Sequence, residues 1–84
     1  MKRGQIVFVT AGKEKGQFMI VLSSDEKMAM LTDGRHRPCD RPKKKSKKHI
    51  SETKTIISEE DLAANSRIKS ILRNFTAQIQ GGIL

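Results

Sequence analysis

Residues 4–21 read Gly-Gln-Ile-Val-Phe-Val-Thr-Ala-Gly-Lys-Glu-Lys-Gly-Gln-Phe-Met-Ile-Val, and they carry the most informative pattern of the chain. Two short runs of β-prone apolar residues, 6–9 and 18–22, flank a loop of glycines and lysines at 12–16. Glycine turns the backbone through positive φ values that other residues avoid. The pattern predicts two strands joined by a tight, positively charged loop.

The first strand, predicted at 5–10, is apolar on both faces. In an extended chain Ile6 and Phe8 point to one side, and Val7 and Val9 point to the other. A strand that is covered on both sides is typical of a barrel wall with a helix or tail packed outside it.

Two further strands are predicted at 17–23 and 28–32, each from its apolar residues. Asp33-Gly34 follows directly and favours a two-residue hairpin turn of type I′, which needs positive φ twice. The returning strand is then expected at 35–39, at an edge of the sheet, because Pro38 has no N–H to donate.

A basic run follows these strands. Residues 41–48 carry six cations and no acid, so the run repels itself and is expected to be extended or disordered when unbound. A fifth short strand is predicted at 47–51. Short strands with tight turns are typical of a small half-open barrel. The predicted fold is mainly β, with the barrel at 1–51 and a helical extension at 52–84.

The last third of the chain is predicted to be helical. Ser58 precedes three acids, which is typical of an N-cap and a first helical turn, and a second start is predicted at Asn65. Gly81-Gly82 is expected to end the helix. The apolar residues of the second part share one face: Ile68, Ile71, Leu72, Phe75 and Ile79. This face either packs on the barrel or binds a partner or a second copy of the chain.

The composition favours a polyanionic partner. Seventeen Lys and Arg against nine Asp and Glu in 84 residues give a net charge of +8, which favours nucleic acid ahead of an anionic membrane. Membrane attachment through the basic run lacks the adjacent apolar helix face or the lipidation site that stable anchoring needs. Cys39 has no second cysteine to pair with, and no segment has the apolar length of a membrane span. We expect a cytoplasmic protein.

The stretch at 4–21 resembles the KOW motif, which is found in ribosomal proteins and transcription elongation factors. The matching positions are Gly4, Val7, Val9, Gly12, Lys15, Gly16 and Val21. The motif usually has one more glycine where Phe18 and Met19 stand here. Residues 33–37 and 41–50 look like the second half of KOW-bearing large-subunit ribosomal proteins of archaeal and eukaryotic type. The resemblance, over residues 4–50, implies an SH3-like barrel that binds ribosomal RNA.

The candidate RNA-binding residues are the loop glycines and the cations of three segments. The loop lysines and the arginines at 35 and 37 are alternatively ordinary solvated charges, and the run at 41–48 is alternatively a solubilising or nuclear-type tail. The chain has no Trp or Tyr, and its three Phe lie in apolar patterns. We therefore expect contact with the phosphates and sugars of folded RNA ahead of stacking on unpaired bases. The set is Gly12, Lys13, Lys15, Gly16, Arg35, Arg37, Arg41, Lys43, Lys44, Lys45, Lys47 and Lys48.

An enzyme is not expected. His36, Cys39 and His49 lack the paired spacing of a zinc site and the third group that orients a nucleophile. We predict no catalytic residue, metal, cofactor or small-molecule substrate. The leading hypothesis is a ribosomal or ribosome-associated RNA-binding protein, part of a ribonucleoprotein of translation, with ribosomal RNA and ribosomal proteins as partners. The alternative is a transcription or translation adaptor whose barrel binds a protein.

Overall fold

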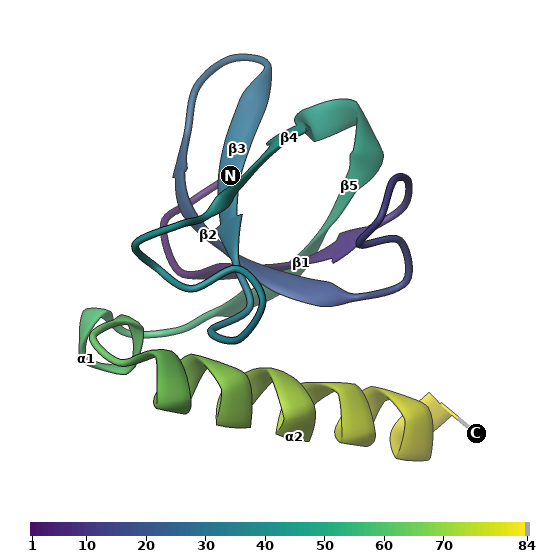
Figure 1. The fold of residues 1–84 in the computed structure, drawn as a ribbon. Helices are drawn as coiled ribbons and strands as arrows, with labels where there is room; N and C mark the ends of the chain where they lie inside the picture. The colour runs from purple at the N-terminus through teal and green to yellow at the C-terminus, as the bar shows by residue number, and fades with distance from the viewer. Residues whose placement is uncertain (84) are drawn as a thin grey trace.

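The computed structural model of the chain describes the backbone of residues 1–83 and the side chains of residues 1–79. Five strands come first and two helices follow (Figure 1). The elements are β1 (Gln5–Val9), β2 (Phe18–Ser24), β3 (Met28–Thr32), β4 (Lys43–Ser46), the 3₁₀ turn η1 (Lys47–His49), β5 (Ile50–Ile56), α1 (Glu59–Leu62) and α2 (Asn65–Ile83). The predicted mainly β fold with a C-terminal helix is confirmed.

The five strands form one antiparallel sheet in the order β4-β3-β2-β1-β5. The register shifts between Gln5 and Val7 in β1 and between Val21 and Ser23 in β2. Such shifts bend a sheet and increase its twist. The sheet curls in Figure 1 but stays open, with β4 and β5 as its two edges.

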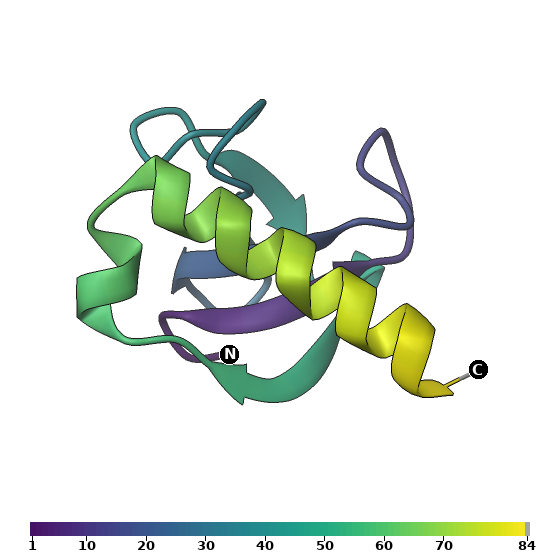
Figure 2. The same cartoon turned by 90° about the horizontal axis from the view of Figure 1, so that it is seen from below.

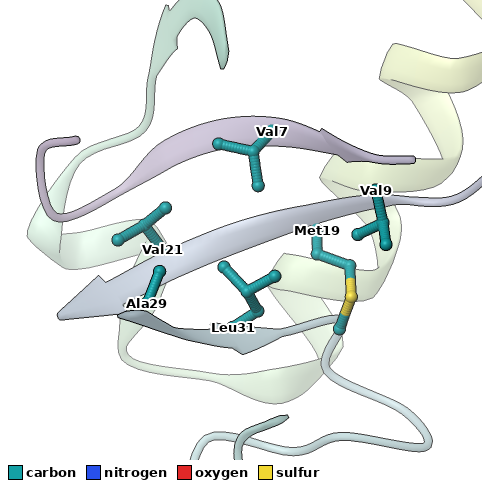
Figure 3. Close-up of a cluster of buried hydrophobic side chains, with 6 residues drawn as sticks. All are labelled: Val7, Val9, Met19, Val21, Ala29 and Leu31. Atoms are coloured by element: carbon teal, nitrogen blue, oxygen red, sulfur yellow. The ribbon is translucent and has the colours of Figure 1, made fainter. Parts of the chain in front are cut away.

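The concave face of the sheet holds the inner core. Val7, Met19 and Leu31 are fully buried there, together with Val9, Val21 and Ala29 (Figure 3). These six side chains come from three adjacent strands, so β1, β2 and β3 each contribute alternate residues to the cluster. The prediction that Val7 and Val9 share one face of β1 is confirmed.

Helix α2 covers the other face of the sheet. It crosses β1 and β2 in Figure 2, and it buries Ile68 and Leu72 against Ile6 and Ile20. Ser58 caps α1 by accepting a hydrogen bond from the backbone N–H of Asp61, as the sequence predicted. The apolar stripe of the helix therefore packs on the sheet, and both faces of β1 are covered.

The predicted hairpin at Asp33-Gly34 is wrong. Residues 33–42 form a loop, and the strand that returns beside β3 is β4. Only Gly34 has a positive φ, of 72°, so the turn is not of type I′. A Cβ at Gly34 would collide with the Asn65 carbonyl oxygen. This glycine is needed because the loop passes close to the start of α2.

Three boundaries also differ from the prediction. Strand β5 begins at Ile50, because residues 47–49 form η1, and it continues to Ile56 because it pairs with β1, so residue 51 lies inside the sheet and does not end it. Helix α2 runs through Gly81-Gly82 to Ile83. Of the two alternatives for the basic run at 41–48, the extended one holds at residues 43–46, which form β4, and residues 47–48 belong to η1.

Candidate nucleic-acid interface

The glycine loop at residues 10–17 turns back on itself between β1 and β2. Gly12 and Gly16 have φ values of 89° and 87°, and the loop is closed by a hydrogen bond from the Gly16 N–H to the Val9 carbonyl, at 2.8 Å. Lys13 and Lys15 are exposed at its tip, whereas Glu14 between them is buried. The loop thus presents two cations outward and turns its one acid inward.

Glu14 joins the glycine loop to two other segments. Its Oε1 lies 3.2 Å from the Nζ of Lys45 in β4, and its Oε2 lies 3.4 Å from an Nη of Arg37 in the 33–42 loop. The Lys45 ammonium also donates a hydrogen bond to the Ala11 carbonyl, at 2.9 Å. Both Glu14 and Lys45 are more than nine-tenths buried. We call this group of Glu14, Lys45 and Arg37 the Glu14 latch.

The surrounding cations keep Glu14 ionised. Burial alone would raise the pKa of its carboxyl group, but the hydrogen-bonding and charge contact with Lys45 opposes this, assisted by the charges of Lys43 and Arg37. The pKa of Glu14 is consequently lower than its ordinary value. The latch is therefore charged, and intact, at neutral pH.

Gly12 makes room for the latch. A Cβ at this position would lie 2.5 Å from the Lys45 ammonium nitrogen, and its φ is one that other residues rarely adopt. A side chain at residue 12 would have to displace the end of Lys45, so glycine leaves that ammonium free to reach the Ala11 carbonyl and Glu14. The predicted binding glycine thus has a structural reason of its own.

The latch brings the 33–42 loop beside the glycine loop. The two loops rise on the same side of α2 in Figure 2. Asp33 stabilises the second loop by accepting hydrogen bonds from the backbone N–H groups of Arg35 and Arg37, at 2.9 and 2.8 Å. Arg35 is exposed, whereas Arg37 is half-buried in the latch. Arg41 is exposed beyond a turn closed by its N–H and the Pro38 carbonyl.

Strand alternation divides the basic run between two faces. Lys43 and Lys45 stand opposite Leu31 and Ala29 of β3, whose side chains belong to the inner core, so this face of β4 carries the latch. Lys44 stands opposite Met30 on the outer face and is exposed. The predicted set therefore does not form one surface.

The outer face of β4 lies near the β2–β3 turn. Asp25 in this turn accepts hydrogen bonds from the backbone N–H groups of Met28 and Lys27, which lower the pKa of its carboxyl group, and Lys44 and Lys47 act in the same direction. Lys48 is exposed on η1. Lys44 and Lys47 thus lie near the β2–β3 turn, whereas the end of η1 is joined to the glycine loop by a hydrogen bond from the Thr10 N–H to the His49 carbonyl.

The sequence did not identify two groups that the structure adds to the interface. Glu14 was visible only as one acid among lysines. Lys69 and Arg73, four residues apart on α2, line a hollow together with Arg35, His36 and Gly16. Helical spacing shows that Lys69 and Arg73 share a helix face, but it does not say which loop that face meets.

No model of a known protein family matches the chain, and no curated protein matches it. Within the described part of the chain, no group of three or more His, Cys, Asp or Glu side chains is placed to hold a metal ion. Over the same residues, no helix has the length and apolar character needed to cross a membrane.

Proposed function

We propose that the protein binds RNA through an SH3-like barrel of the KOW type, and that it acts as a ribosomal or ribosome-associated protein in the cytoplasm. The observation that carries the proposal is the Glu14 latch. It holds the glycine loop, β4 and the 33–42 loop together, so that exposed cations from separate parts of the sequence stand at one end of the sheet. The five-stranded antiparallel sheet has the strand number that such a barrel would need.

The free cations at this end are suited to phosphates. Lys13, Lys15 and Arg35 are exposed and lie outside the latch. Phosphate contacts fix the position of RNA without reading its sequence, and they release counterions. If about five cations engage phosphates, log K should fall with log[salt] at a slope of roughly −3.5 to −4.5.

A filter-binding titration with folded ribosomal RNA at several salt concentrations tests the proposal. The variant is Lys13→Gln/Lys15→Gln, and the matched control is Lys2→Gln/Lys54→Gln, which removes the same charge from exposed positions elsewhere. Loss of two phosphate contacts should weaken binding and reduce the slope by about 1.4 to 1.8, whereas the control should behave as the wild type. Replacing every lysine of the basic run would be uninformative, because Lys45 is buried in the latch.

Binding that ignores salt, or that falls equally in the variant and its control, would contradict the proposal. Co-purification with a ribosomal protein or polymerase in the absence of RNA binding would favour an adaptor. Sucrose-gradient fractionation of a lysate then distinguishes a ribosome-bound protein, which sediments with a subunit, from a free one.

A further inference from the structure

A hollow of about 600 Å³ lies between α2, the glycine loop and the 33–42 loop. One wall consists of α2 and the other consists of the two loops, so the hollow is a groove beside the helix. Its lining combines the cations Arg35, Lys69 and Arg73 with one acid, Asp33, and with the apolar side chains of Phe18 and Leu72.

The groove cations outnumber the acids of the lining. Within residues 1–79 the ion pairs of arginine are those of Arg3 with Glu59, Arg37 with Glu14 and Arg67 with Asp61. Arg35, Lys69 and Arg73 make none there. The lining holds one acid, Asp33, whose Oδ1 accepts two backbone hydrogen bonds. Three cations against one carboxylate leave the groove with a surplus of positive charge, which attracts an anion.

The floor of the groove is apolar and includes an aromatic ring. Phe18 is partly exposed, and its ring is held by Phe8 and Phe75, with centroids 5.0 Å away in each case. Leu72 lies beside it on α2. The combination of an aromatic floor and a cationic rim fits unpaired nucleotides, whose bases bind apolar surface while their phosphates bind cations.

We propose that this groove binds an unpaired strand of RNA. Arg35, Lys69 and Arg73 hold consecutive phosphates, and a base lies on the floor formed by Phe18 and Leu72. The proposal rests on the proposed RNA binding and adds a second mode to it: the loop tip contacts the phosphates of folded RNA, and the groove holds an adjacent unpaired segment. Folded RNA would then be recognised where a helix meets a loop.

The test measures binding of fluorescein-labelled octauridylate by anisotropy, with duplex RNA of the same length as a competitor. Lys69→Gln/Arg73→Gln should weaken octauridylate binding at least about tenfold, because two charge-assisted contacts are lost. The control Lys2→Gln/Lys54→Gln removes the same charge outside the groove. It should weaken binding less than about twofold.

A second pair of variants adds a negative charge instead of removing positive ones. Ala77 is exposed and lines the groove, whereas Gln78 is exposed and does not line it. Ala77→Glu should weaken octauridylate binding, and Gln78→Glu, which changes the net charge equally, should have a much smaller effect. Both positions face solvent on α2, so neither substitution disturbs the core.

Backbone amide NMR shifts locate the ligand directly. Octauridylate should shift the amide signals of Gly16, Lys69 and Arg73 ahead of those of β5. Equal losses in each variant and its control, or shifts confined to β4 and η1, would overturn the groove proposal. If the wild type binds folded ribosomal RNA with steep salt dependence but not octauridylate, the groove proposal fails alone. If it binds neither, the proposed function fails too.

Discussion

Replacing Glu14 with glutamine tests the Glu14 latch, because it removes one charge and keeps the size of the side chain. At an effective dielectric constant of about 20, unit charges 3.2 Å apart attract by about 5 kcal/mol before desolvation is counted. Removing one partner of a buried pair typically costs about 3–5 kcal/mol, since the other charge stays buried.

The expected loss here is smaller, about 2–3 kcal/mol, because the Ala11 carbonyl still accepts from Lys45 and glutamine can also accept a hydrogen bond. Arg37 is about one-third exposed, so its share is screened by water. An 84-residue domain has a total stability of roughly 4–13 kcal/mol. The loss should therefore lower Tm by roughly 10–20 °C.

Urea and thermal unfolding followed by far-UV circular dichroism measure this loss; the chain has no Trp for fluorescence. Glu26→Gln, at an exposed turn, is the control and should change stability by less than about 0.5 kcal/mol. The double variant Glu14→Gln/Lys45→Met should be more stable than Glu14→Gln, since no buried charge remains unpaired. A Glu14→Gln protein as stable as its control, or a double variant less stable than the single one, would refute the reasoning.

Other predictions concern pH, a glycine, the helix interface and a cap. Because the pKa of Glu14 is lowered in the folded state, its ionised carboxylate stabilises the fold above the ordinary pKa of glutamate, and this contribution is lost as pH falls through the folded-state value. Urea titrations from pH 7 to pH 3 should show a smaller decrease in the free energy of unfolding for Glu14→Gln than for the wild type. Gly34→Ala should cost more than Gly16→Ala in the same unfolding assay: both positions have positive φ, but only at Gly34 would a Cβ meet the helix; equal costs would contradict the close approach. Ile68→Ala should cost about 2–5 kcal/mol by leaving a cavity between α2 and the sheet, measured by thermal unfolding. Ser58→Ala should cost about 1 kcal/mol by the same measurement, through loss of the N-cap of α1.

The strands and the helix stripe could be predicted because their signals are local. β3 has the predicted bounds, Met28–Thr32, and the two apolar faces of β1 follow from the alternation of Ile6 to Val9. The two-fold and 3.6-fold repeats of side-chain direction are enough to assign such faces from one sequence. The N-cap at Ser58 was equally local, since its partner is three residues away.

The hairpin prediction was wrong because one of the contacts that shape the 33–42 loop comes from a residue far away in the sequence. Asp33 forms hydrogen bonds with Arg35 and Arg37 instead of entering a type I′ turn. The side chain of Asn65 accepts from the Cys39 N–H and holds the loop against α2, 26 residues later. No pattern around Asp33-Gly34 contains that contact, so an ordinary turn signal led to the wrong strand.

The division of the basic run between two faces could not be predicted for a related reason: it depends on the tertiary fold. A count of charges treats the cations of 41–48 as one group, whereas a strand sends alternate residues to opposite faces. Lys44 and Lys45 are neighbours in sequence, yet one is exposed and the other is buried against Glu14. Burial of a lysine requires an acid at the right place, and the position of that acid depends on the tertiary fold.

One buried acid thus determines which cations are available to the proposed RNA. Glu14 engages Lys45 and Arg37, and an engaged, buried ammonium cannot also neutralise a phosphate without breaking the latch. The exposed cations of the loop tip and the groove have no such partner among the residues with described side chains. The net charge of +8 overstates the binding charge on any one face, since β4 directs Lys44 away from the latch. It follows that the salt dependence of RNA binding should respond to Lys13, Lys15, Arg35, Lys69 and Arg73, while Lys45 should affect stability first and affinity only through the position of the loop.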